Sequence, residues 1–205
     1  MDSYLTLDHP GMDEVTIQKS RFIGRAWPCS TEEEALARLR ETRDAFRDAR
    51  HHCYAYIIGE NEGILRYSDD GEPGGTAGMP ILSLLRSEKL VNCCVVVTRY
   101  FGGIKLGTGG LVRAYTSSAK LALEAAGIRE VREMVELDVI LEYTYLARVE
   151  NMIREKGYDI EDTTYEDRVR MRISCLAEDA EYLKKQLAEL TGGTFEIVSE
   201  NEKNA

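Results

Sequence analysis

A run of 17 residues from Arg99 to Tyr115, RYFGGIKLGTGGLVRAY, contains five glycines and three basic residues but no acidic residue. Glycine lets the backbone adopt left-handed conformations and come close to a ligand. The free N–H groups at the start of a helix attract anions. This composition therefore predicts a loop that binds an anion such as RNA phosphate. The residues predicted to contact the anion are Arg99, Lys105, Gly107, Thr108, Gly109, Gly110 and Arg113.

Two well-known anion-binding motifs do not fit this stretch. Gly102 and Gly107 have the spacing of a P-loop, but Thr108 occupies the position at which that motif requires lysine. Gly107 and Gly109 begin the dinucleotide-binding pattern, but Val112 stands in place of its third glycine. An ordinary ATPase or a Rossmann enzyme is therefore not expected. The alternative interpretation of the glycines is structural, because they also permit a helix to pack closely on a strand.

A second glycine-rich stretch, RYSDDGEPGGTAGMP, runs from Arg66 to Pro80 and carries Asp69, Asp70 and Glu72. A magnesium site favours one or two carboxylates together with substrate phosphates, so these three alone are an incomplete metal site. Asp, Gly and Pro are also typical of turns. We interpret the stretch as a loop and predict neither a metal ion nor a cofactor. Its first two carboxylates offer Arg99 an alternative to phosphate, namely an ion pair within the protein.

His51, His52 and Cys53 lie side by side in the segment ARHHCYAY, at the start of a predicted strand. Neighbouring residues of a strand face opposite ways, so the two histidines are not expected to share one metal ion. One of them could instead meet a carboxylate of the Asp69–Asp70 loop. Cys53 lacks an evident third group that would orient a histidine base, so no catalytic residue is predicted. A secondary candidate site comprises His51, His52, Asp69, Asp70 and Glu72.

The anion loop is expected to lie between a strand and a helix. Val91–Tyr100 is rich in β-branched residues and predicts a strand. Residues 109–126 predict a helix with Thr108 as its N-cap and Gly127 as its stop. The other elements predicted in the first half are strands over 15–17, 22–27, 52–58 and 64–67, a helix that begins at a capping box formed by Ser30 and Glu33, and a short helix over 79–86.

The second half has the order strand, helix, strand, strand, helix, strand. The predicted strands cover 135–141, 158–165, 169–175 and 194–199, and the predicted helices cover 145–156 and 180–190, which end at Gly157 and at Gly192–Gly193. This βαββαβ order is that of the ferredoxin-like fold. Many functions occur on that fold, so it assigns none by itself.

The frequency of glycine and the net charge both differ between the two parts of this chain of 205 residues. Eleven of its 17 glycines fall between Gly59 and Gly110, whereas three follow Met134. The net charge is −10, of which residues 1–133 contribute −2 and residues 134–205 contribute −8. We therefore predict an α+β protein of two domains. Their predicted bounds are 1–130 and 134–205, with a join near Arg129–Met134.

A locally basic surface is compatible with this acidic total. Between Lys89 and Leu123 there are five basic residues and no acidic one. Salt screens exposed charges beyond about 8–10 Å, so distant carboxylates do not cancel such a group.

Composition also indicates in which cellular compartment the protein is expected. No run of about 18 apolar residues is present, so neither a membrane span nor a membrane partner is expected. The first residues lack the features of a secretory signal, which favours the cytoplasm. The five cysteines are expected to be small buried residues in a reducing compartment. Cys93 and Cys94 are adjacent and should point to opposite faces of a strand.

Four segments together resemble the IMPACT family, in its bacterial YigZ branch. They are KSRFIG (Lys19–Gly24), DARHHCYAY (Asp48–Tyr56), YSDDGEPGGTAGMPIL (Tyr67–Leu82) and VVVTRYFGGIKLGTGGLVRAY (Val95–Tyr115). The resemblance implies that the N-terminal domain has the fold shared by a small-subunit ribosomal protein and the fourth domain of elongation factor G. It implies that the C-terminal domain is similar to the fifth domain of that factor. Eukaryotic members act in translational control by binding an activator of the amino-acid-starvation kinase.

Three functions remain open on the sequence. The first is a regulatory binding protein of translation, in which the basic glycine-rich loop contacts RNA or the ribosome. The second is a protein–protein regulator that does not bind RNA, with the acidic C-terminal domain as its partner surface. The third is an enzyme that acts on a phosphorylated small molecule, with Asp69, Asp70 and Glu72 helping to hold a metal ion, although the set of nucleophile, base and orienting group is absent.

Overall fold

The computed structural model describes residues 3–204, which form two compact units. The first unit comprises residues 3–130, and the second begins at Val131. Both units combine helices with an antiparallel sheet, so the predicted α+β class with two domains is confirmed. No helix within the described residues is long and apolar enough to span a membrane.

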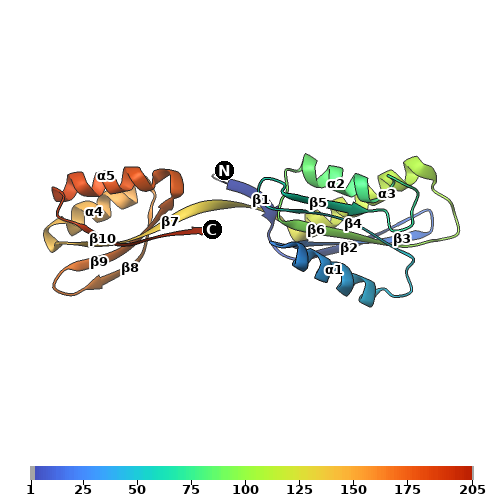
Figure 1. The fold of residues 1–205 in the computed structure, drawn as a ribbon, viewed down its shortest axis with the longest axis horizontal. Helices are drawn as coiled ribbons and strands as arrows, with labels where there is room; N and C mark the ends of the chain where they lie inside the picture. Colours follow the sequence, from blue (N-terminus) through green and yellow to red (C-terminus); the bar gives the residue numbers. More distant parts are fainter. Residues whose placement is uncertain (1–2, 205) are drawn as a thin grey trace. The chain divides into compact units, whose positions relative to one another are not determined.

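The first unit contains six strands and three helices among the described residues. Its elements are β1 (Ser3–Leu7), β2 (Gly11–Ile17), β3 (Ser20–Pro28), α1 (Glu32–Ala45), β4 (His51–Ile58), β5 (Ile64–Ser68), α2 (Gly78–Ser87), β6 (Cys93–Tyr100) and α3 (Gly107–Ala126). Five strands form one sheet in the order β2-β3-β6-β4-β5. Helices α2 and α3 cover one face of this sheet, and α1 covers the other (Figure 1).

Strand β6 is the central strand and is buried on both faces, as its continuous β-branched sequence indicates. Cys93, Val95 and Val97 belong to the core beneath α2 and α3. Cys94 and Val96 belong to the core beneath α1. The prediction that the two adjacent cysteines face opposite sides is confirmed. Because β6 is packed on both sides, it is a firm base for the glycine-rich loop that follows it.

The second unit has the predicted βαββαβ order. Its elements are β7 (Ile128–Leu141), α4 (Tyr143–Lys156), β8 (Asp159–Tyr165), β9 (Val169–Leu176), α5 (Ala180–Thr191) and β10 (Glu196–Asn204). The strands lie in the order β10-β7-β9-β8, which is the ferredoxin-like arrangement. Gly157 and Gly192 end the two helices with φ values of 72° and 61°, left-handed conformations that glycine adopts readily.

The division between the units lies between Glu130 and Val131, and residues 129–134, where the join was expected, belong to strand β7. Strand β7 begins at Ile128, directly after the glycine that ends α3, and the division between the units falls within it. Sequence patterns predicted the strand over 135–141 but missed its charged start, residues 128–134. The backbone nevertheless pairs with β10, for example Met134 with Lys203, and such pairing does not require apolar side chains.

The capping box at the start of α1 is shifted by one residue from the predicted Ser30 and Glu33. Thr31 is the N-cap, and its hydroxyl accepts a hydrogen bond from Glu34 N at 3.2 Å. The Glu34 carboxylate accepts from Ser30 N at 2.6 Å. Thr31 has the extended backbone that an N-cap requires, with φ −132° and ψ 159°.

The fragment 1–130 is expected to fold alone, because each unit has its own buried core. It should melt cooperatively in circular dichroism and give dispersed amide signals in NMR spectra. The fragment 131–205 is the matched control. A disordered 1–130 fragment would show that the first unit needs the second in order to fold.

Candidate anion-binding site

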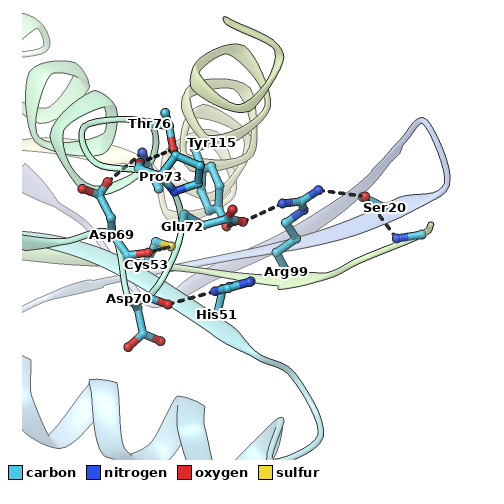
Figure 2. Close-up of polar contacts among 12 residues, drawn as sticks. Ser20, His51, Cys53, Asp69, Asp70, Glu72, Pro73, Thr76, Arg99 and Tyr115 are labelled. Atoms are coloured by element: carbon cyan, nitrogen blue, oxygen red, sulfur yellow. Dashed lines mark hydrogen bonds and ion pairs between the residues drawn. The ribbon is translucent and has the colours of Figure 1, made fainter. Parts of the chain in front are cut away.

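The two glycine-rich stretches come together around a buried carboxylate, Glu72 (Figure 2). Its Oε1 accepts hydrogen bonds from Arg99 Nη1 on β6 and from the Tyr115 hydroxyl on α3, each at 2.7 Å. Arg99 Nη2 donates to Ser20 Oγ on β3 at 3.3 Å. The same Ser20 oxygen accepts from Gly102 N at 3.2 Å. A continuous set of polar contacts therefore joins the loop after β5, the end of β6, α3 and β3.

Arg99 belongs to the interior of the protein. The side chains of Arg99 and Glu72 are 6% and 4% exposed. The Arg99 guanidinium carbon lies 5.4 Å from the ring centroid of Phe22 and 5.4 Å from that of Phe101. The predicted alternative, pairing with Asp69 or Asp70, is wrong in its partner, because Glu72 takes that place. The charge of Arg99 is neutralised by Glu72 inside the protein, so Arg99 is not available to an external anion. The other basic residues predicted to contact the anion are exposed.

Asp69 closes the N-terminus of α2. Its carboxylate accepts hydrogen bonds from the backbone N–H groups of Gly75, Ala77 and Gly78, at 2.8, 2.9 and 2.9 Å. Burial alone would raise the pKa of Asp69, but these three hydrogen bonds outweigh burial and lower that pKa. Asp69 therefore remains ionised and occupies the position that a bound anion would take at this helix.

The histidines meet the Asp70 segment in a different way from the one predicted. The backbone N–H of His52 donates to the Asp70 carboxylate at 2.7 Å, and Arg43 also pairs with that carboxylate at 3.1 Å. His51 Nδ1 lies 2.9 Å from the Asp70 carbonyl oxygen. His52 Nδ1 lies 3.0 Å from the Thr98 hydroxyl, and burial lowers the pKa of His52. Among residues 3–204, neither imidazole forms an ion pair with a carboxylate, and the Asp70 carboxylate instead binds a backbone amide and an arginine.

Cys53 is a buried structural residue. Its thiol donates to the Asp69 carbonyl oxygen at 2.9 Å, and burial raises the pKa of Cys53 far above its ordinary value. The thiol is therefore protonated and a poor nucleophile. The carboxylates of Asp69, Asp70 and Glu72 each bind different partners, and residues 3–204 contain no group of three or more His, Cys, Asp or Glu placed to hold a metal ion.

The N-terminus of α3 is open, unlike that of α2. Its N-cap position is Leu106, which has no capping side chain, and no side chain of residues 3–204 accepts a hydrogen bond from the first-turn N–H groups. Thr108 was the predicted N-cap, but it lies inside the first turn because the helix begins at Gly107. Lys105 and Arg113 flank this end and are exposed, and neither has an ion-pair partner within the part of the chain that the structure describes. The first turn also contains no acidic residue.

The five glycines around this end have different roles. A side chain at Gly102 would overlap the backbone of the β2–β3 turn, so that glycine is required by packing. Gly103 and Gly107 have φ values of 86° and 71°, which favour glycine. A Cβ at Gly110 would lie 2.9 Å from a leucine Cβ. Gly109 has neither constraint: the nearest atom to an added Cβ is an arginine nitrogen at 3.7 Å. Packing therefore explains part of this glycine-rich loop but leaves Gly109 without a structural reason.

Sequence analysis missed one exposed base at this end, Lys19. It forms the β2–β3 turn with Gln18, and both residues have positive φ values, 64° and 45°. The turn packs against Gly102 at the start of the loop that carries Lys105. Lys19 is exposed and has no ion-pair partner among residues 3–204. Two strands separated by two residues are a hairpin signal, but Gln-Lys lacks the glycine or asparagine that usually reveals the turn.

The site lies in a segment shared with known proteins. Residues 18–123 match the Impact N-terminal domain, and residues 139–194 match a domain of unknown function, DUF1949. The chain is 39% identical over 197 residues to the IMPACT family member YvyE of Bacillus subtilis (strain 168), covering 96% of this chain and 91% of that protein. This chain belongs to the IMPACT family. The resemblance drawn from the four sequence segments is confirmed.

One further relative and one solved structure match both units, and a yeast relative matches part of the chain. The IMPACT family member YigZ of Escherichia coli (strain K12) is 33% identical over 201 residues, covering 97% of this chain and 98% of that protein. A crystal structure of a hypothetical protein is 33% identical, with a TM-score of 0.64 over 97% of this chain and 98% of that chain. The IMPACT homolog of Saccharomyces cerevisiae is 32% identical over 118 residues, 56% of this chain and 45% of that protein.

The different roles of the glycines predict opposite stability changes. Gly109→Ala should stabilise the protein by about 0.5–1 kcal/mol, because alanine is the better helix former and has room. Gly102→Ala should destabilise it by about 1–3 kcal/mol through overpacking. Urea unfolding followed by circular dichroism measures both. Destabilisation by Gly109→Ala would restore the purely structural interpretation of this glycine.

Glu72→Gln should destabilise the protein by about 3–5 kcal/mol, because it leaves the buried Arg99 charge uncompensated. The matched control is Glu14→Gln, which breaks a half-exposed pair with Arg21 and should change stability little. The double variant Glu72→Leu, Arg99→Met should recover part of the loss, since no charge is then buried. Equal stability of Glu72→Gln and the control would contradict this account.

Proposed function

We propose that this protein is a regulatory binding protein of translation in the cytoplasm that contacts RNA phosphate through the N-terminus of α3. One observation carries the proposal. Within residues 3–204, helix α3 begins without a side-chain cap and beside exposed bases that lack ion pairs, whereas α2 on the same face of the sheet is capped by Asp69. One helix start is therefore satisfied internally, and the other is free to take an external anion.

The chemistry of this end suits a phosphate group. Backbone N–H groups in the first turn of α3 can donate to phosphate oxygens, and the helix dipole favours negative charge there. Lys105 and Arg113 supply positive charge beside it, and Lys19 supplies more from the neighbouring turn. Gly109 leaves the approach to the first turn open. Contacts of this kind hold RNA by its backbone and carry no sequence information.

Membership of the IMPACT family supports the link to translation. The resemblance implies translational control in the eukaryotic members and a fold shared with a ribosomal protein and an elongation-factor domain. The predicted anion-contacting residues all fall within residues 18–123, the segment that matches the Impact N-terminal domain.

A second candidate function is a contact with a protein partner at the same end of the unit. Phe101, Ile104 and Val112 are large apolar side chains that remain exposed around the glycine-rich loop. Exposed apolar side chains near one another are a feature of protein interfaces. A protein partner would bury these side chains, whereas RNA backbone binding would depend chiefly on the basic residues.

Lys105→Ala should weaken RNA binding and reduce its salt dependence. If Lys19, Lys105 and Arg113 neutralise three phosphates of a single strand, log affinity falls against log salt with a slope of roughly −2. Loss of one contact should make the slope shallower by about 0.7, equally for different RNA sequences. Fluorescence-anisotropy titrations of labelled RNA at several salt concentrations measure this slope.

The matched control is Lys120→Ala. Lys120 is exposed and has no ion pair with any residue that the structure describes, but it lies 12 residues after Thr108 along α3, far from the first turn. This variant should leave the slope unchanged. No binding at low salt, or equal slopes for wild type and Lys105→Ala, would contradict the proposed RNA contact and favour the protein-partner candidate.

A further inference from the structure

We propose that Phe101 is a stacking platform for an unpaired base, so that the RNA held at α3 is single-stranded. This inference rests on the proposed contact with RNA phosphate. Phe101 follows β6 directly and is 55% exposed, at the start of the loop that leads to the open helix end. It is an aromatic ring presented to solvent beside exposed basic residues.

The ring is supported from beneath by a layered arrangement of buried groups. The rings of Tyr115 and Phe22 meet edge to face, with centroids 5.3 Å apart. The Arg99 guanidinium lies over Phe22 and also over Phe101, at 5.4 Å from each centroid. Glu72 holds that guanidinium at 2.7 Å. Phe101 is therefore the outermost member of a series of stacked or edge-packed groups that begins in the core.

This support prepares the ring for a ligand. An exposed phenylalanine on a flexible loop would lose conformational freedom on binding, which opposes association. Phe101 is instead anchored by a cation that is fixed by an ion pair and almost fully buried. A planar ligand can extend the series outward without rearrangement of the groups below it.

The chemistry of the platform selects a class of RNA. Every base has a π-face that can stack on an aromatic ring, so this contact tolerates different sequences. Bases within a duplex are stacked and paired with each other, whereas those of single strands can be splayed onto aromatic side chains. Phe101 is six residues before Gly107, so the two lie at most about 20 Å apart. One short single strand can place a base on the ring and its phosphates at the helix end.

The test compares three labelled oligomers by fluorescence anisotropy: a short unstructured RNA, the duplex of the same sequence with its complement, and an abasic ribose-phosphate chain of equal length. Phe101→Ala should weaken binding of the single strand about tenfold and leave binding of the abasic chain and of the duplex unchanged. Phe101→Trp should retain binding of the single strand. Phe101→Leu, which keeps an apolar side chain without an aromatic face, should lose binding as alanine does.

A spectroscopic measurement reports stacking directly. An RNA with 2-aminopurine should lose fluorescence on binding to wild type, and this quenching should disappear with Phe101→Ala. Tyr67→Ala is the matched control, since Tyr67 is a half-exposed aromatic residue on the edge strand β5. It should change neither affinity nor quenching.

The outcomes separate this inference from the proposed function. If Lys105→Ala weakens RNA binding but Phe101→Ala does not, phosphate contact stands and the platform is overturned. If Phe101→Leu binds the single strand like wild type, the contact is apolar and not a stack, which also overturns the platform. If wild type binds none of the oligomers at low salt, the proposed function fails and the platform fails with it.

Discussion

The buried ion pair between Glu72 and Arg99 determines the arrangement on which the rest of the glycine-rich surface depends. Taking two charges out of water is unfavourable unless their remaining hydrogen-bonding groups are satisfied. Here most of them are: the Tyr115 hydroxyl shares the carboxylate, Ser20 accepts from the guanidinium, and two aromatic rings lie 5.4 Å from the guanidinium carbon, whereas Arg99 Nε is buried without a hydrogen-bond partner among residues 3–204. A different position of either loop would leave one charge buried without a partner, so the pair specifies how the two loops meet.

The neighbours of Glu72 explain how a loop with three acidic residues can lie near a site for anions. Asp69 is directed to the backbone of α2, and Asp70 is directed to β4 and Arg43. Each carboxylate is already balanced by N–H groups or by a cation. Their negative charge is therefore offset locally, and the exposed end of α3 keeps a basic character in a protein whose net charge is −10.

Sequence patterns predicted the elements that depend on local rules. Apolar periodicity and glycine stops located α2, α4 and α5 to within two residues, and the continuous β-branched run located β6. The patterns failed where tertiary contacts decide. Strand β1 and the charged start of β7 were missed, because strand pairing satisfies their backbone groups without an alternating apolar pattern. Three-dimensional proximity also selected Glu72, and not Asp69 or Asp70, as the partner of Arg99, which spacing along the chain does not reveal.

The C-terminal unit shows why the basic surface is found in the N-terminal unit. Arg168, just before β9, and Arg170 and Arg172 within it occupy alternate positions, a spacing that could present three positive charges on one face. Each instead pairs with a carboxylate from a neighbouring segment: Arg168 with Glu196, Arg170 with Asp138 and Arg172 with Glu136. The hydrogen bond from Arg170 lowers the pKa of Asp138, so this pair remains charged and closed well below neutral pH. These arginines stabilise the sheet through cross-strand pairs.

By contrast Lys105 and Arg113 have no such carboxylate within residues 3–204, although the chain has ten more acidic than basic residues. Positive charge is therefore accessible to an external anion where the sequence contains no acidic residue, over the 35 residues from Lys89 to Leu123 that include the glycine-rich loop.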